Sequence, residues 1–227
     1  MNTSTSTSAA SVATYVTSSV SAAAPIVFVV DDDASVRESL QLLIEAAGWQ
    51  AAPFATSKDF LARPRATAPS CLVLDMSLPA HDGFDLQKRL VADRSDMPII
   101  VISACGDVRM SVQAMKAGAM DFLTKPLSDT LVLDSMHQAL ERSRRVLEHR
   151  ARLRRVHENY SALTRREREV MLLVASGLLN KQVGGELGIS EITVKAHRGQ
   201  VMRKMNADSL PALVHMAASL GLTAAFA

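Results

Sequence analysis

Residues 26–33 have the sequence Ile-Val-Phe-Val-Val-Asp-Asp-Asp, in which five apolar residues run directly into three carboxylates. An uninterrupted apolar run of this length is typical of a strand that is buried on both faces of a parallel sheet. Apolar residues then recur at helical spacing from Val36 to Ala47, and Gly48 is placed to end that helix. The stretch therefore predicts a strand–helix unit with acidic side chains at the carboxyl end of the strand.

The same alternation of strand and helix continues to about residue 127. We expect further strands at Gln50–Phe54, Cys71–Leu74, Ile99–Ile102 and Asp121–Leu123, and helices near Lys58–Ala62, Phe84–Ala92 and Val108–Ala117. Strands that alternate with helices form a parallel sheet covered on both faces. The first part of the chain is therefore predicted to be an α/β domain, in which ligands bind beyond the carboxyl ends of the strands.

After residue 127 the pattern predicts helices alone. One long helix, from Asp129 to about Tyr160, leads to a capping box at Thr164-Arg-Arg-Glu167 that opens a second domain. In its second half, spacings of three and four favour a short coiled coil and a solvated linker helix equally; the residues concerned are Val146, His149, Leu153, Val156 and Tyr160. We expect a disordered leader at 1–24, the α/β domain at 25–140, a helical linker at 141–160 and an all-α domain at 161–227.

Charge differs between the two parts of the chain. Its 227 residues are enough for two compact domains. Up to Leu127 there are 10 Lys and Arg against 13 Asp and Glu, whereas the remainder has 15 against 10. We therefore expect only the second part to bind a polyanion such as nucleic acid.

The first 24 residues are almost entirely Ser, Thr, Ala and Val, without one Lys or Arg. Secretory signals and transit peptides need basic residues that this segment lacks. The chain also has no apolar run long enough to span a membrane, and its two cysteines do not make a disulfide framework. We therefore expect a cytoplasmic protein without membrane contact.

Reactive side chains follow four of the predicted strands. Asp31–Asp33 follow the first strand, Asp75 ends the third, Ser103 ends the fourth and Lys125 follows the fifth. Folded as a parallel sheet, these side chains converge at one edge. Clustered carboxylates repel one another, and Mg²⁺, which prefers oxygen ligands, would relieve that repulsion. A carboxylate can also form an aspartyl-phosphate, whose oxygens a lysine and a hydroxyl would then stabilise.

Each of these signals has a simpler interpretation when taken alone. An Asp triplet after a strand often only caps a helix, and Asp33 is placed to do so. A lone Lys125-Pro126 would be a surface turn. Their joint placement after strands one, three, four and five favours a phospho-acceptor site.

The same segments resemble the receiver domain of two-component response regulators. The resemblance runs from about Ile26 to Leu140 and is carried by Val29-Val30-Asp31-Asp32-Asp33, Leu72-Val73-Leu74-Asp75-Met76-Ser77-Leu78-Pro79, Asp82-Gly83 and Thr124-Lys125-Pro126. It implies a flavodoxin-like fold with five parallel strands in the order 2-1-3-4-5. It also implies that a sensor histidine kinase phosphorylates Asp75.

The resemblance assigns roles to the other residues of this edge. Asp32 and Asp75 would bind Mg²⁺ directly, Asp31 through water, and the Ser77 backbone carbonyl would complete the protein ligands. Ser103 and Phe122 match the family's switch pair, and Lys125 matches the lysine that contacts the phosphoryl group. Ser77 stands where the family more often has a basic or amide residue, so the resemblance does not extend to the lifetime of the phosphate.

Short, closely spaced helices are predicted after Leu163. They are Arg165–Ser176, a helix capped by Asn180 that runs to Leu187, a helix capped by Ser190 that runs to about Met205, and Leu210–Leu220. Two short helices joined by a tight glycine-containing turn form a helix-turn-helix. On the third helix, an apolar stripe should face the core and leave Lys195, Ala196, Arg198, Arg203 and Lys204 for phosphates or base edges. The spacing alone is equally compatible with a small bundle that has a solvated basic face.

Here too the residues resemble a known module, the LuxR-type helix-turn-helix. The matching segments are Leu163–Val170, Asn180-Lys181-Gln182-Val183, Leu187–Ser190 and Thr193-Val194-Lys195-Ala196-His197. The whole chain is then similar to the NarL/FixJ family of response regulators, with the FixJ-like branch most similar in layout. The resemblance implies that Lys195 and Ala196 face the major groove and that Thr193, Lys181 and Arg198 are placed for phosphates. It also implies that Leu210–Leu220 supplies an apolar face for dimerisation.

Two departures limit what is carried over. Gly184-Gly185 lies inside the second helix, where each Gly costs about 1 kcal/mol against Ala. Gly199 stands one turn after Lys195, where a longer side chain is frequent in the family. Transfer of base specificity is weakened accordingly.

The function expected is a phosphorylation-gated transcription factor, with Mg²⁺ as cofactor and two-fold operator DNA as target. Homodimers would form on phosphorylation or on DNA, RNA polymerase is a further candidate partner, and enzymatic activity would be limited to phosphorylation and dephosphorylation of Asp75. A phosphohydrolase would need an acid–base Asp two residues after the nucleophile, where Ser77 stands. A receiver that docks on partners without DNA is disfavoured by the basic second domain.

Overall fold

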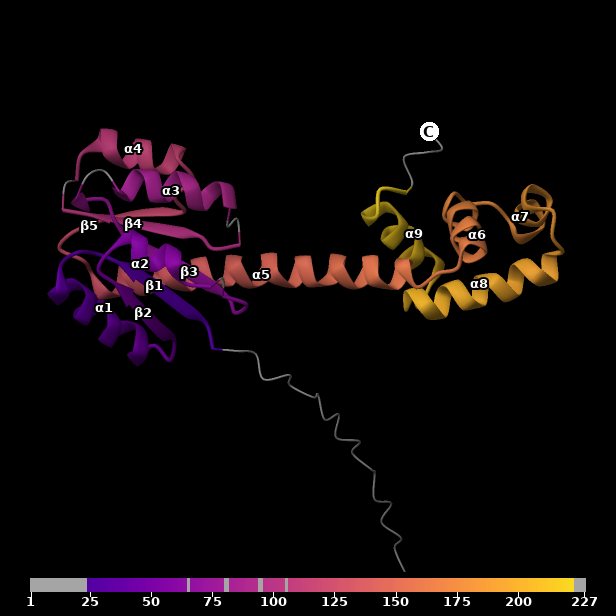
Figure 1. Cartoon of the computed structure of the whole chain (residues 1–227), viewed down its shortest axis with the longest axis horizontal. Coiled ribbons are helices and arrows are strands. Elements are labelled where there is room, and N and C mark those ends of the chain that lie inside the picture. Colours follow the sequence, from indigo (N-terminus) through magenta and orange to yellow (C-terminus); the bar gives the residue numbers. More distant parts are fainter. Residues whose placement is uncertain (1–23, 65, 80–81, 94–95, 105, 223–227) are drawn as a thin grey trace, which may run out of the picture. The chain divides into compact units, whose positions relative to one another are not determined.

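The computed structural model describes residues 24–222, apart from residues 65, 80–81, 94–95 and 105. The leader expected at 1–24 therefore lies almost entirely outside the described residues. The chain divides into two compact units, one formed by Met1–Asp93 with Ile99–Met136 and the other by Arg94–Pro98 with His137–Ala227. Figure 1 labels their helices and strands. In the part of the chain that is described, no helix is both long and apolar enough to cross a membrane.

The first unit is built on a five-stranded parallel sheet in the order β2-β1-β3-β4-β5. The strands are β1 (Ile26–Val30), β2 (Gln50–Phe54), β3 (Ser70–Asp75), β4 (Ile99–Ser103) and β5 (Asp121–Thr124). Every residue of β3 and β4 is buried, as expected for central strands with helices on both faces. The predicted α/β fold and strand order are thus confirmed.

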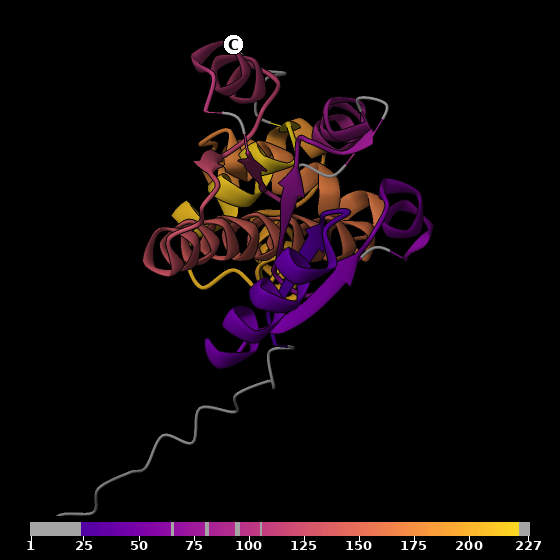
Figure 2. The same ribbon diagram turned by 90° about the vertical axis from the view of Figure 1, so that its left-hand side faces the viewer.

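Helices cover both faces of this sheet. They are α1 (Ala34–Ala46), α2 (Ser57–Ala62), α3 (Asp82–Asp93) and α4 (Val108–Lys116). Figures 1 and 2 show α3 and α4 on one face and α1 on the other. Asp33 caps α1 as predicted, because its side chain accepts the N–H of Ser35.

The second unit is all-helical, as predicted. After the long helix α5 (Asp129–Ser161) come α6 (Arg165–Ala175), α7 (Asn180–Leu187), α8 (Glu191–Met205) and α9 (Leu210–Ser219). The capping box of Thr164 and Glu167 is present at the start of α6. The stripe expected to face the core does so, since Val194, Val201 and Met205 are all buried.

The end of α5 belongs to the core of the helical unit. Val156 is buried in that core and Tyr160 packs against it, while the Asn159 side chain donates to the Met205 carbonyl (3.2 Å). Neither the coiled coil nor the solvated linker accounts for Val156, because its partners are side chains of the helical unit itself.

Two details of the helical unit differ from expectation. Asn180 does not cap α7: the N-cap position is Leu179, whose side chain offers no acceptor, and Gln182 accepts the Leu179 N–H instead (2.8 Å). The apolar face of α9 is also used within the unit, because Leu213 and Ala217 are buried in its core. Dimerisation through α9 remains a prediction. Only the α9 side chains that are not buried in the core of the unit could contact a second copy.

Candidate functional site

The carboxyl edge of the sheet brings together the acidic side chains that the sequence places after β1 and β3. Asp31, Asp32 and Asp75 each offer one carboxylate oxygen, and these oxygens lie within 4.8 Å of one another. Asp31 and Asp75 are buried, whereas Asp32 is exposed. The cluster is therefore reachable from solvent although two of its carboxylates lie in the protein interior.

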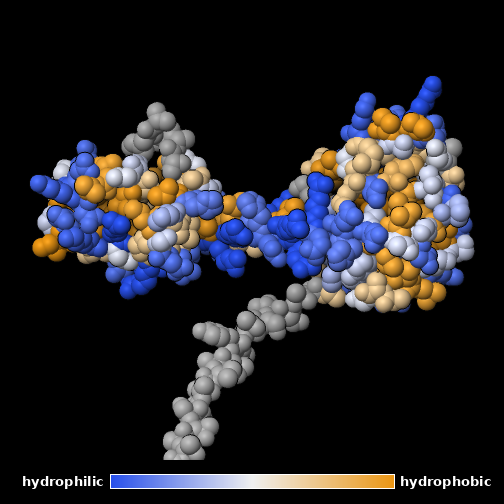
Figure 3. Space-filling view, turned by 180° about the vertical axis from the view of Figure 1, so that it is seen from behind, coloured by the Kyte–Doolittle hydropathy of each residue, from blue (hydrophilic) through white to orange (hydrophobic). Residues whose placement is uncertain are grey.

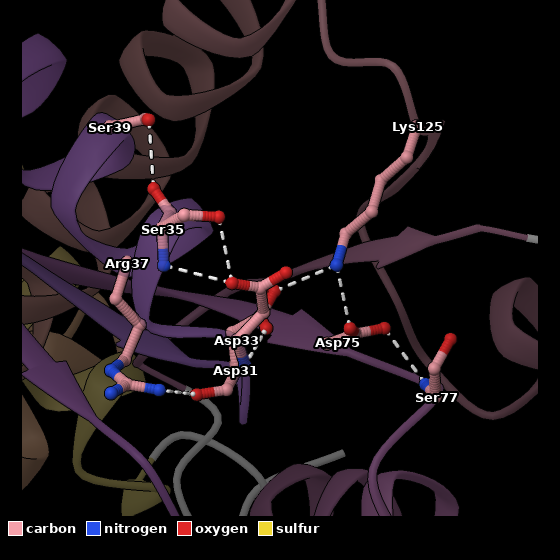
Figure 4. A network of polar contacts seen from close by, with 8 residues as sticks. All are labelled: Asp31, Asp33, Ser35, Arg37, Ser39, Asp75, Ser77 and Lys125. Atoms are coloured by element: carbon pink, nitrogen blue, oxygen red, sulfur yellow. Dashed lines mark hydrogen bonds and ion pairs between the residues drawn. The ribbon is translucent and has the colours of Figure 1, made fainter.

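Lys125 joins the two buried carboxylates. Its Nζ lies 2.9 Å from Oδ2 of Asp31 and 2.7 Å from Oδ2 of Asp75 (Figure 4). These contacts connect residues that are 94 and 50 positions apart in the chain. The convergence predicted for Asp31, Asp75 and Lys125 is thus present in the structure.

Burial and ion pairing have opposite effects on the pKa values of Asp31 and Lys125. Burial raises the pKa of Asp31, and hydrogen bonds from Lys125 and from the Asp33 N–H only partly oppose this. For Lys125, burial lowers the pKa, but hydrogen bonds to Asp75 and Asp31 outweigh it, so the net pKa is raised. The lysine is therefore held firmly in its charged form beside an excess of carboxylates.

Backbone N–H groups orient the same carboxylates. Oδ1 of Asp31 accepts from the Asp33 N–H, and Oδ1 of Asp75 accepts from the Ser77 N–H, each at 2.8 Å. From α1, Arg37 donates to the backbone carbonyl of Asp31 (2.7 Å), a contact that sequence analysis missed (Figure 4). Arg37 lies one turn beyond the cap, and only the folded loop brings it back to the strand end.

The donor set fits a hard divalent cation. Three carboxylates are available, and the Ser77 backbone adjoins Asp75. Mg²⁺ takes one or two carboxylates and fills the remainder of its octahedral shell with water and phosphate oxygens. Asp32 is exposed, so its carboxylate could bind such an ion without first moving out of the protein interior.

Ser103 and Phe122, the expected switch pair, lie on neighbouring strands: Ser103 ends β4, and Phe122 is the second residue of β5, in register with Val101. Ser103 is buried, and its Oγ lies 3.3 Å from Sδ of Met110. Phe122 is half-buried on β5. The two residues thus occupy the predicted strand positions, and their exchange of conformations stays a prediction.

The helical unit presents most of the predicted DNA contacts along the outer side of α8. Thr193, Lys195, Ala196 and Arg203 are exposed there. On the face of this unit that Figure 3 shows, hydrophilic and hydrophobic groups are intermingled. Lys195 pairs with Glu191 one turn earlier, at 3.2 Å, which holds its chain along the helix. Lys181 is exposed on α7. Arg198 donates to Oδ1 of Asn180 (3.2 Å) and thereby links α8 to α7.

Lys204 differs from the other basic candidates. Its Nζ lies 2.7 Å from Oε2 of Glu167, a buried carboxylate that also accepts the Thr164 N–H. The hydrogen bond from Lys204, together with that from Thr164, lowers the pKa of Glu167. The helical spacing places Lys204 off the apolar stripe but does not indicate this partner, because Glu167 lies on α6 and comes close only in the folded bundle.

Comparisons with known proteins agree with both units. Residues 27–148 match the response regulator receiver domain, and residues 161–217 match bacterial regulatory proteins of the luxR family. Nodulation protein W of Bradyrhizobium diazoefficiens is 45% identical over 88% of each chain. The transcriptional regulatory protein FixJ of the same organism is 36% identical over 86% of this chain and 96% of its own.

Solved structures show the same relationship. The response regulator StyR is 44% identical, with a TM-score of 0.78 over 86% of this chain and 99% of its own. Fold, acidic edge and helix-turn-helix thus define a two-component response regulator with a DNA-binding output domain. The chain belongs to the NarL/FixJ family of these transcriptional regulators.

Proposed function

We propose that this protein is switched by phosphorylation of Asp75 and then binds a two-fold operator through its helical unit. The observation that carries the proposal is the bridge from Lys125 to the buried carboxylates of Asp31 and Asp75. Such an arrangement holds a nucleophilic carboxylate, an excess of negative charge and one lysine ammonium at an edge that solvent reaches.

The phosphoryl donor would be the phosphohistidine of a sensor kinase. A carboxylate oxygen of Asp75 forms a bond to phosphorus as the phosphorus–nitrogen bond breaks, and the imidazole leaves with its electron pair. Asp31, Asp32 and Asp75, with the Ser77 carbonyl, would hold Mg²⁺, and the ion would supply positive charge next to the phosphoryl group. Lys125 exchanges its contact with Asp75 for a phosphoryl oxygen, and Ser103 and Phe122 would respond to that change.

The helical unit supplies the output. Lys195 and Ala196 lie where the N-terminal part of a recognition helix reads base edges in the major groove. Thr193, Lys181, Arg198 and Arg203 would contact phosphates, which position the protein without reading sequence. Lys204 would join them only by leaving Glu167, so we rank it last among the basic candidates.

Dimerisation would couple the two units. In the receiver, α4 exposes Val108, Val112 and Met115 at spacings of four and three residues, which places three apolar side chains on one face. Apolar groups are visible at the surface where α4 lies (Figure 3). We infer that a homodimer forms on phosphorylation or on DNA. RNA polymerase would be a further partner. The protein would act in the cytoplasm, where both the DNA and the sensor kinase are accessible to it. Asp75 chemistry would be its only enzymatic activity.

One experiment tests both halves of the proposal. The full-length protein is incubated with labelled acetyl phosphate and Mg²⁺, and the product is titrated with DNA selected from a random duplex library. We expect the wild-type protein to be labelled and to gain affinity, while Asp75→Asn is neither labelled nor activated. Asp134→Asn, which removes an exposed carboxylate on α5, is the matched control.

Labelling of Asp75→Asn at the wild-type level would place the acceptor elsewhere. A phosphorylated wild-type protein that binds selected and random DNA equally would contradict the operator-binding half instead. Circular dichroism of each variant separates these outcomes from loss of fold.

A further inference from the structure

Ile192 is the most exposed large hydrophobic side chain among the described residues, with 80% of its surface accessible. It lies in the first turn of α8, between Glu191 and Thr193. A single exposed apolar residue is ordinary on protein surfaces. Its meaning here depends on its neighbours.

Those neighbours are the residues to which base contacts are assigned. Positions three and four apart share a helix face, so Ile192 lies on the same side of α8 as Lys195 and Ala196, both exposed. The core stripe, with Val194 and Val201, faces the other way. Ile192 is therefore an apolar point on the face of the recognition helix that carries Lys195.

The charge around this point selects its partner. Lys195 lies one turn after Ile192, Lys181 is exposed on α7, and Arg203 is exposed further along α8. A protein partner would be expected to need a wider apolar patch, whereas Ile192 and Ala196 offer only a small one between cations. A polyanion that carries isolated apolar groups matches this pattern better.

We propose that Ile192 is a specificity-determining residue that packs against the C5-methyl group of a thymine in the operator, an inference that rests on the proposed DNA binding. The thymine methyl is the apolar group that base pairs present in the major groove. Because the N-terminal residues of a recognition helix contact base edges, a first-turn side chain is within reach. Ile192 would thus require a T·A pair at one position of each half-site.

Uracil tests this contact at the level of one group, because it keeps the hydrogen-bonding edge of thymine and lacks the methyl. Sites are first selected from a random duplex library with phosphorylated full-length protein. Each thymine of a selected site is then replaced by deoxyuridine, one position at a time, and affinities are measured for the wild-type protein and Ile192→Ala. Leu42→Ala, which removes a similarly exposed side chain (69%) from the receiver, is the control.

At one thymine of a half-site we expect deoxyuridine to weaken the wild-type protein and Leu42→Ala about fourfold, the effect of one buried methyl-sized group. Ile192→Ala should bind the thymine site about fourfold more weakly and lose nothing more with uracil. Repeating the selection with Ile192→Ala should relax the preference at that position alone.

Three results would overturn the inference. If no thymine shows a uracil effect that depends on residue 192, the methyl contact is absent. An equal loss on selected and random DNA for Ile192→Ala would assign the side chain to the sugar–phosphate backbone. Failure of the wild-type protein to select any sequence would overturn the proposed operator binding and this inference with it, whereas the first two results leave operator binding intact.

Discussion

In the receiver and in the helical unit a lysine pairs with a buried carboxylate, but the surroundings of the two pairs differ. Lys125 bridges Asp31 and Asp75, and the exposed Asp32 lies beside them, so negative charge exceeds positive charge. Lys204 pairs with one carboxylate among the described residues, that of Glu167, and also donates to the Ala162 carbonyl (3.4 Å). The same Glu167 oxygen accepts the Thr164 N–H that completes the cap of α6.

This difference separates a reactive site from a structural one. At the sheet edge the surplus of carboxylates leaves capacity for a metal ion and a phosphoryl group. At Glu167 the charge is balanced and its acceptor capacity serves the helix cap, so displacement of Lys204 would cost stability without creating a binding site. A buried ion pair therefore indicates function only together with the charge around it.

The largest effect should come from removing the receiver lysine. Lys125→Ala should slow phosphorylation by acetyl phosphate about a hundredfold, the usual cost of one group that stabilises developing charge. It should bind Mg²⁺ at least as tightly as the wild-type protein, because Lys125 no longer occupies oxygens of Asp31 and Asp75. Calorimetric titration with Mg²⁺ and initial labelling rates measure the two effects, with Lys88→Ala as control. Weaker Mg²⁺ binding would mean that Lys125 organises the site instead of competing for it.

On the output surface, Lys195 and Lys181 should differ in kind. Lys195→Ala should reduce discrimination between operator and random DNA by about 1–3 kcal/mol. Lys181→Ala should weaken both DNAs alike and lower the salt slope by about one. Titrations at several salt concentrations decide between them, and equal losses on both DNAs for Lys195→Ala would reassign it to phosphate contact.

The substitution Glu167→Gln tests the ion pair between Lys204 and Glu167, because it keeps the capping contact and removes the negative charge. We expect a loss of about 2 kcal/mol at pH 7, the value of a hydrogen bond to a charged group. Since folding lowers the pKa of Glu167, the unfolded chain takes up the proton first as the pH falls. The stabilisation is therefore complete above the ordinary pKa of Glu and is lost as the pH falls through the lower folded value.

Calorimetric unfolding of the wild-type protein and Glu167→Gln, at pH 7 and at progressively lower pH, measures the difference in their free energies of unfolding. Glu186→Gln, at an exposed position, is the control. The difference between wild type and Glu167→Gln should shrink as the pH falls. A constant difference at all pH values would mean that shape, and not charge, stabilises this contact.

The smallest effect concerns the two adjacent glycines of α7, which sequence analysis treated alike. An added Cβ at Gly185 meets nothing within 4 Å, so Gly185→Ala should stabilise the protein by about 1 kcal/mol. At Gly184 it would lie 2.7 Å from the Ile189 carbonyl in the turn to α8, so Gly184→Ala should destabilise. Each variant is the control for the other, and urea unfolding compares them. If Gly184→Ala also stabilised the protein, the backbone of the turn at Ile189 would have to shift to admit the added Cβ at little cost.

Sequence patterns predicted the strands because their signals are local. A buried apolar run such as Ile26–Val30, or a cap such as Ser190, needs no knowledge of distant residues. The convergence of Asp31, Asp75 and Lys125 could be predicted as well, because strand alternation fixes which ends meet at one edge of a parallel sheet.

Other features depended on contacts between segments that no local pattern relates. The Arg37 contact with the Asp31 carbonyl requires the β1–α1 loop to fold back, and the burial of Val156 requires α5 to end against the helical unit. The missing cap at Asn180 is of the same kind, because its side-chain oxygen accepts from Arg198 of α8 instead. A side chain forms its hydrogen bonds with groups that lie close to it, and the packing of the whole domain determines which groups those are.

The sequence by itself determined the alternation of elements, the acidic and basic halves and the residues available for chemistry, since hydrophobic periodicity and charge are properties of neighbouring residues. Only the tertiary structure decided which carboxylates Lys125 joins, that Lys204 turns to Glu167, and that Gly184 but not Gly185 is needed. These outcomes depend on distances of a few ångströms between helices and strands, and such distances arise only when the whole core packs at once.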